Sequence, residues 1–112
     1  MYMKKNTLIF GGTKGIGLVI AKYLKSRGDN IINFARSVSE NKKNIKIDLS
    51  NELSIASSLK KINHIKKIDN IIFSQRYRGA DWKEDFQVSV FSIDQIIKIL
   101  KNKISKNGSV IL

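Results

Sequence analysis

The stretch LIFGGTKGIGLVIAKYLKSRGDNIINFARS, residues 8–37, contains the two periodicities that decide the fold. Apolar runs at residues 6–10 and 30–35 are typical of buried strands. Between them, a glycine-rich turn at residues 11–17 leads into apolar residues at helical spacing, and Gly28 is a natural stop for that helix. The members of the helical pattern are Ile16, Val19, Ile20, Tyr23 and Leu24. We therefore predict a strand, a glycine turn, a helix and a second strand.

Three glycines of the turn have separate expected roles. Gly11 permits a tight turn off the strand, Gly15 lets the backbone approach a pyrophosphate, and Gly17 lets the helix pack against the strand. The N–H groups of the first helical turn and the positive end of the helix dipole also favour a negatively charged ligand. A plain turn without a ligand is the alternative. The spacing of these glycines directly after a strand favours a phosphate-binding loop.

The rest of the chain repeats the alternation of strand and helix patterns. Apolar runs at residues 44–47, at 69–74 and from 109 onward predict three more strands. One helix is predicted from about residue 51 to 62, with Ser50 as its N-cap and Glu52 in its first turn. A longer helix is predicted over 82–103, closed by Gly108. Continuous apolar strands that alternate with helices predict an α/β fold with a doubly wound parallel sheet.

The predicted long helix carries two apolar sets. The first, at alternating spacings of four and three, is Phe86, Val90, Ile93, Ile97, Leu100 and Ile104. The second is Val88, Phe91, Ile96 and Ile99. One set is expected to cover the sheet, which leaves the other more apolar than a solvated face. We therefore expect a homo-oligomer that forms through the helix at 82–103.

Composition limits the classes of function. The 112 residues, 42% of them hydrophobic, suffice for a single domain over residues 1–112. The absence of cysteine excludes disulfides and thiolate chemistry, and we expect no metal site. The net charge is +12, but only four of the 21 basic residues are arginines and the lysines are scattered, so nucleic acid is not the expected partner. Without a signal peptide or a membrane-length apolar segment, the expectation is a cytoplasmic protein with no membrane partner.

The glycine spacing over residues 11–17 is Gly-x-x-x-Gly-x-Gly, unlike the Gly-x-Gly-x-x-Gly of other dinucleotide folds. Here the chain closely resembles the N-terminal half of the short-chain dehydrogenase/reductase family, whose motif is Thr-Gly-x-x-x-Gly-x-Gly. The resemblance covers the whole chain and includes ARS after the second strand, DLS after the third and GSVIL at the fifth. It implies a Rossmann-like sheet in strand order 3-2-1-4-5, here truncated after the fifth strand, with a nicotinamide dinucleotide across the carboxyl ends of the strands.

The end of the second strand indicates which dinucleotide is bound. Folds that prefer NAD place a carboxylate there, whereas this chain has Arg36 and Ser37, which suit the 2′-phosphate of NADP. Lys14 adds a second cation, so we expect NADP rather than NAD. In the family, the residues at Asp48 and Leu49 contact the adenine, although Asp48 would serve equally as a helix cap. The predicted cofactor-binding residues are Gly11, Thr13, Lys14, Gly15, Ile16, Gly17, Arg36, Ser37, Asp48, Leu49, Ser74 and Gln75.

Three positions depart from the family pattern. The leading threonine of the glycine motif is Phe10 here, and residues 73–76 read Phe-Ser-Gln-Arg where the family commonly has Asn-Asn-Ala-Gly. The asparagine of the family's proton relay aligns with Ser89. These departures weaken the expectation of the usual relay and leave the phosphate loop intact.

No catalytic residue is assigned. The family uses a serine after its fifth strand and a Tyr-x-x-x-Lys pair, and none of Tyr2, Tyr23 and Tyr77 has a lysine four residues later. The basic segment around Tyr77 is expected to meet a cofactor phosphate or an acidic substrate, or to be a solvated loop. His64 lies in a lysine-rich segment and is expected to be exposed rather than catalytic.

The sequence thus predicts the NAD(P)-binding portion of a short-chain dehydrogenase/reductase-type oxidoreductase. In the full-length parent, hydride would pass between NADP(H) and a carbonyl or alcohol substrate whose identity the sequence does not indicate. Two alternatives remain: a non-catalytic dinucleotide-binding sensor or regulatory protein, and a basic nucleic-acid binder. We expect the 112 residues alone, as a fragment, to bind NADP without turnover.

Overall fold

Five parallel strands form one sheet in the order β3-β2-β1-β4-β5, as predicted. The structure is a computed structural model that describes residues 4–75 and 79–112. The strands are β1 (Asn6–Phe10), β2 (Asn30–Ala35), β3 (Asn44–Lys46), β4 (Ile68–Phe73) and β5 (Ile104–Ile111). The first two have the predicted bounds, because each is a continuous apolar run that is buried on both faces of the sheet.

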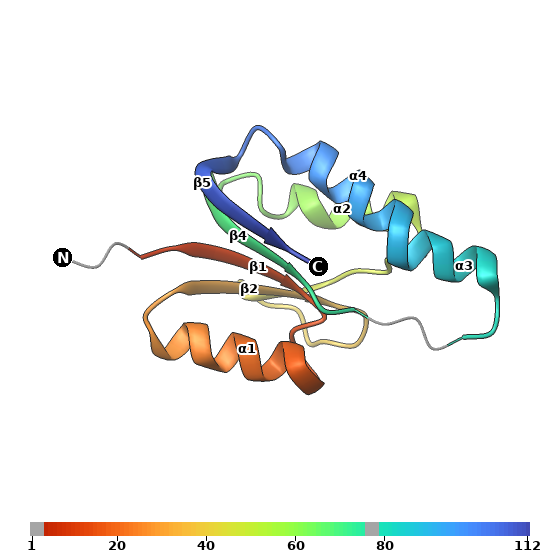
Figure 1. Cartoon of the computed structure of the whole chain (residues 1–112), viewed down its shortest axis with the longest axis horizontal. Coiled ribbons are helices and arrows are strands. Elements are labelled where there is room, and N and C mark those ends of the chain that lie inside the picture. The colour runs from red at the N-terminus through yellow and green to blue at the C-terminus, as the bar shows by residue number, and fades with distance from the viewer. Residues whose placement is uncertain (1–3, 76–78) are drawn as a thin grey trace.

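Helices cover both faces of this sheet (Figure 1). The helix α1 (Gly15–Ser26) lies on one face by itself. The other face carries α2 (Glu52–Lys60), the short α3 (Trp82–Phe86), the π-helical turn η1 (Gln87–Phe91) and α4 (Ser92–Leu100). The predicted doubly wound α/β architecture is therefore confirmed.

The buried apolar cores on the two faces of the sheet differ in size. Most buried apolar residues lie between the sheet and α2 with α4, where the ring of Phe10 stacks on those of Phe34 and Phe73 with centroids 4.5 and 5.2 Å away. On the other face, α1 approaches the sheet closely because its buried positions are the small residues Gly17 and Ala21. A helix that packs on small residues buries only a narrow stripe.

The prediction for the apolar face of α1 was therefore partly wrong. Ile20 and Leu24 pack against the smaller core cluster, as the helical spacing indicated. Ile16, Val19 and Tyr23, the other members of the pattern, are mostly exposed.

The first turn of α2 also differs from the prediction. Its N-cap is Asn51, whose side-chain oxygen accepts hydrogen bonds from the backbone N–H groups of Leu53 and Ser54 at 2.9 and 3.2 Å. Ser50 does not cap the helix, and its N–H and its hydroxyl both donate to Asp48. The expected acidic residue of the first turn, Glu52, is in place.

The long helix predicted over 82–103 is interrupted by η1 and ends at Leu100. The wider π turn changes which side chains face the sheet, so neither predicted set covers the sheet by itself. Val88 and Ile96 of the second set are buried, whereas Phe86 and Val90 of the first set are about half exposed.

The fifth strand begins earlier than predicted. Ile104 pairs with Ile68, so β5 starts five residues before Ser109, and the register shifts before Ser109 pairs with Asn70. Gly108 lies inside this irregular part of β5 and does not close a helix. Between the helix and β5, the ammonium group of Lys103 donates to the backbone oxygens of Asn63 and Ile65 at 3.0 and 2.9 Å.

Candidate functional site

The predicted site residues follow four neighbouring strands at the carboxyl edge of the sheet. The glycine turn follows β1, Arg36 and Ser37 follow β2, Asp48 and Leu49 come after β3, and Ser74 and Gln75 follow β4. Parallel strands bring these segments to one edge although they are as many as 64 residues apart. The topology thus gathers the predicted residues at the edge where open α/β sheets bind ligands.

The start of the glycine turn is too crowded for any side chain. Gly11 has a φ of +94°, and its N–H donates to the Phe34 oxygen at 2.8 Å. A Cβ at Gly11 would lie 2.9 Å from the backbone nitrogen of Gln75, and one at Gly17 would lie 2.3 Å from the Gly11 oxygen. These two glycines therefore let the ends of β1, β4 and α1 approach one another.

Gly15 is different because no contact with a described residue demands a glycine there. Its φ is +56°, and an added Cβ would meet no described atom within 4 Å. It opens α1, whose N-cap is Lys14, without a side-chain capping bond and without an acidic residue in the first turn. The helix start therefore keeps its positive end uncompensated beside open space.

The residues around this opening are accessible. Lys14, Gly15 and Ile16 are exposed and Thr13 is partly exposed. The side chain of Ile16 is 76% exposed, which is unusual for an isoleucine next to a core.

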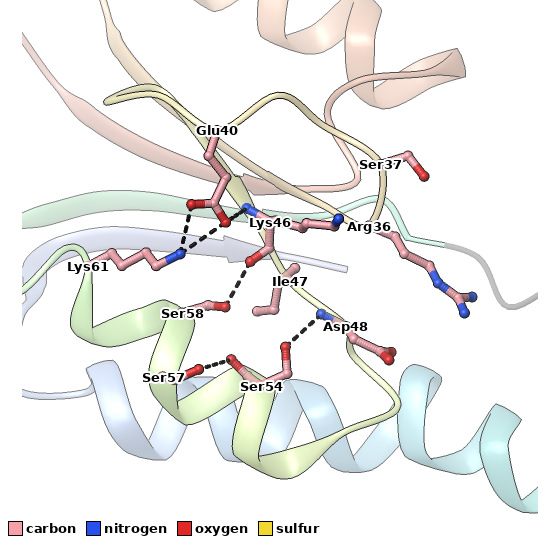
Figure 2. A pocket seen from close by; sticks show the side chains of 10 residues that line it. All are labelled: Arg36, Ser37, Glu40, Lys46, Ile47, Asp48, Ser54, Ser57, Ser58 and Lys61. Carbon is pink, nitrogen blue, oxygen red and sulfur yellow. Dashed lines mark hydrogen bonds and ion pairs between the residues drawn. The ribbon is translucent and has the colours of Figure 1, made fainter.

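A cavity of about 510 Å³ lies beside the ends of β2 and β3 (Figure 2). Its lining residues come from the loop after β2, from β3 with the residues that follow it, and from α2: Arg36, Ser37, Glu40, Lys46, Ile47, Asp48, Ser54, Ser57, Ser58 and Lys61. Three of these were predicted site residues: Arg36, Ser37 and Asp48. Sequence reasoning missed Glu40, Lys46 and Lys61. One signal in the sequence could have found Lys46. It stands in the run predicted as the third strand, two residues before the predicted site residue Asp48.

The surroundings of Asp48 favour the charged form of its carboxyl group. Hydrogen bonds from the Ser50 hydroxyl and N–H lower the pKa of its carboxyl group, against a smaller opposing effect of burial, and the charge of Arg36 lowers it further. Because Asn51 caps α2, the alternative in which Asp48 caps that helix is wrong. Leu49 is partly buried and packs against the large core.

At the end of β4, Gln75 connects the sheet to η1. Its side-chain nitrogen donates to the Val88 oxygen at 3.5 Å, and the buried hydroxyl of Ser92 donates to the same oxygen at 2.6 Å. Among the described residues, the Gln75 Oε1 and Gln87 Nε2 atoms are buried without a hydrogen-bond partner. The predictions for Arg76, Tyr77 and Arg78 lie outside the described residues.

Other sequence-based expectations also have a place in the structure. The hydroxyl of Ser89, which aligns with the relay asparagine of the family, lies on η1 and donates to Asp85 at 2.8 Å. His64 is exposed. Within residues 4–75 and 79–112, no group of three or more His, Cys, Asp or Glu side chains is arranged to hold a metal ion. No helix in that part of the chain has the length and hydropathy needed to cross a membrane.

The arrangement matches solved structures although no family model and no curated protein matches the chain. A short-chain dehydrogenase/reductase from Brucella ovis superposes with a TM-score of 0.80 at 21% identity, covering 96% of this chain and 59% of that one. A Brucella ovis oxidoreductase of the same family, in complex with partially ordered NAD, gives 0.74 at 22% identity, with 90% and 58% covered. The 3-alpha-hydroxysteroid dehydrogenase from Pseudomonas sp. B-0831, complexed with NADH, gives 0.71 at 20% identity, with 96% and 46% covered.

The chain has the short-chain dehydrogenase/reductase fold. It spans between 46% and 59% of the lengths of these three structures. The short-chain dehydrogenase/reductase fold in this chain includes the glycine turn, the five strands in their expected order and the strand ends that carry the predicted site residues.

Proposed function

We propose that this chain is the dinucleotide-binding part of an oxidoreductase of the short-chain dehydrogenase/reductase type and that it prefers NADP to NAD. One observation carries the proposal. The glycine turn after β1 and the Arg36–Ser37 segment after β2 lie at adjacent strand ends, which the hydrogen bond from the Gly11 N–H to the Phe34 oxygen joins.

The pyrophosphate would lie at the start of α1. An added Cβ at Gly15 would meet no described atom within 4 Å, and Gly15 is the first residue of α1, where the backbone N–H groups lack acceptors within the helix. The exposed cation Lys14 stands next to them. Backbone donors, the helix dipole and a nearby ammonium group all favour a ligand with two negative phosphates.

The adenosine end would lie across β2 and β3. Arg36 and Ser37 are exposed and supply a guanidinium and a hydroxyl group where NAD-preferring folds have a carboxylate. Two of the similar solved structures contain NAD or NADH, and this supports a nicotinamide dinucleotide in general. The preference for NADP rests on Arg36 and Ser37, with Lys14 as a second cation in the glycine turn.

The chemistry would be hydride transfer, which the nicotinamide ring supplies when it is bound. The residues of this chain would bind and orient the dinucleotide. We do not assign proton transfer to any of them, because the sequence contains no Tyr-x-x-x-Lys pair.

The cofactor preference is tested by titrating NADP and NAD into the protein and into Arg36→Ala. A hydrogen bond to a charged group contributes about 1.5–3 kcal/mol, so we expect NADP to bind roughly tenfold more tightly than NAD. Arg36→Ala should remove most of that difference by weakening NADP alone. The matched control is Arg27→Ala, since Arg27 lies at the other end of α1 against the ring of Tyr23. Equal affinity of the starting protein for the two dinucleotides would refute the preference.

A further inference from the structure

The cavity beside β3 extends well beyond the two residues predicted to read a 2′-phosphate (Figure 2). Arg36 and Ser37 lie at one end of it, and Glu40 and Lys61 lie at the other. Lys46 lies between them, on the last position of the edge strand β3. The identity of the groups that remain free along this cavity determines which ligands it favours.

The backbone of β3 offers little to a ligand, because side chains already occupy its outward-facing groups. The Lys46 N–H donates to Glu40 at 3.3 Å, and the Lys46 oxygen accepts from the Ser58 hydroxyl at 2.8 Å. The Asp48 N–H donates to the Ser54 hydroxyl at 3.0 Å. The recognition capacity of the cavity therefore lies in its charged side chains.

Of the three cations that line the cavity, only Lys61 forms an ion pair among the described residues. The ammonium group of Lys61 lies 2.8 Å from the Glu40 carboxylate, and the hydrogen bond from Lys61 lowers the pKa of that carboxyl group. Neither Arg36 nor Lys46 takes part in an ion pair within the part of the chain that the structure describes. The two cations outside any such ion pair are thus the ones toward the Ser37 end, although the charge of Lys46 also lowers the pKa of Glu40 and that of Arg36 lowers the pKa of Asp48.

Strand register places these two cations close together. Lys46 is paired with Ala35 across β2 and β3, so it lies beside the residue that precedes Arg36. Figure 2 shows its side chain extending along the cavity toward the segment that carries Arg36. Lys14, the second cation expected from the sequence, does not line this cavity.

We propose that Lys46 is a second specificity-determining residue for the 2′-phosphate of the dinucleotide, acting beside Arg36, and that Lys61 screens the Glu40 carboxylate from that phosphate. The proposal rests on the proposed NADP preference and adds residues to it. A phosphate monoester dianion between a guanidinium and an ammonium group meets two cations, whereas a free ribose hydroxyl gains little from them. Asp48 already contributes to this cavity one carboxylate outside any ion pair among the described residues, and without Lys61 the Glu40 carboxylate would be a second one and would repel the phosphate.

The test uses two ligands that differ only by the 2′-phosphate, adenosine 2′,5′-bisphosphate and 5′-AMP. We expect the wild-type protein to bind the bisphosphate more tightly and Lys46→Met to reduce this preference about three- to tenfold. Lys42→Met is the matched control, because it removes the same charge from an exposed position in the loop before β3, outside the cavity. Affinity for 5′-AMP should stay unchanged in both variants.

The outcomes separate the two proposals. A wild-type preference for the bisphosphate that Lys46→Met and Lys42→Met change equally would overturn the role of Lys46 and leave the NADP preference standing. Equal binding of the two ligands by the wild-type protein would overturn both.

A second pair of variants tests the screening by Lys61. Lys61→Met should weaken binding of the bisphosphate about threefold, because it leaves the Glu40 carboxylate without its partner. Adding Glu40→Gln should restore the affinity. If the double variant binds as weakly as Lys61→Met, Lys61 contacts the phosphate itself and the screening role is wrong.

Discussion

At the scale of single residues, Gly15 and Gly28 share a backbone conformation but differ in surroundings. Both have a positive φ, +56° and +92°, where an alanine costs about 1–2 kcal/mol. Gly28 ends the α1 region, remote from the strand ends that carry the candidate site. Gly15 opens α1 at that edge, and a Cβ there would point into space that no described atom fills.

The two glycines therefore give a matched pair of variants. We predict that Gly15→Ala and Gly28→Ala both lower the free energy of unfolding, while only Gly15→Ala weakens NADP binding, by about tenfold. Urea unfolding measures the first effect and calorimetric titration the second. Normal NADP binding by a folded Gly15→Ala variant would place the pyrophosphate elsewhere.

At the scale of elements, the start of α2 is capped by only one of two neighbouring residues that are both common at N-caps. Ser50 and Asn51 are both good N-cap types, but Asp48 takes both donors of Ser50. Asn51 then accepts from two backbone N–H groups of the first turn. The cap is thus decided by a contact that lies outside the helix.

We predict that Asn51→Ala lowers the free energy of unfolding by about 1 kcal/mol, because two N–H groups of α2 lose their acceptor. Ser50→Ala should cost clearly less, since it leaves the cap in place. Urea denaturation at pH 7 compares the two variants directly. A larger loss in Ser50→Ala would mean that Ser50, as the sequence indicated, is the cap.

At the scale of the whole molecule, α3 and η1 present an exposed apolar surface. We call it the aromatic ridge, and its members are Trp82, Phe86, Val90 and Phe91, which are between 48% and 66% exposed. The rings of Trp82 and Phe86 meet edge to face with centroids 6.1 Å apart, and that of Phe91 lies 6.3 Å from Phe86. Four neighbouring large apolar side chains in water are characteristic of an interface.

We keep the prediction of a homo-oligomer through the region 82–103 and assign the interface to the aromatic ridge. Phe86→Glu should raise the dissociation constant of the dimer at least tenfold, because association would bury a charge. Light scattering at tens of micromolar measures the change. Leu53→Glu is the control, since Leu53 is an 81% exposed apolar residue on α2 outside the ridge. A wild-type protein that is monomeric under these conditions would contradict the prediction.

The sequence by itself determined the α/β class, the bounds of β1 and β2 and the edge at which the candidate site lies. Continuous apolar runs alternate with helical patterns, and a parallel topology then places every strand end at one edge. The glycines at 11 and 17 were also predictable, since a turn between a buried strand and a closely packed helix leaves no room for a Cβ. Local chemistry and topology were sufficient for all of these.

Only the tertiary structure decided the rest. The π turn at Gln87–Phe91 changes which side chains of this region are buried. Ile104 belongs to β5 because it pairs with Ile68 of β4. The cavity brings Glu40, Lys46 and Lys61 together from a loop, a strand and a helix. Such features depend on contacts between segments far apart in the chain, whose distances and register no local pattern encodes.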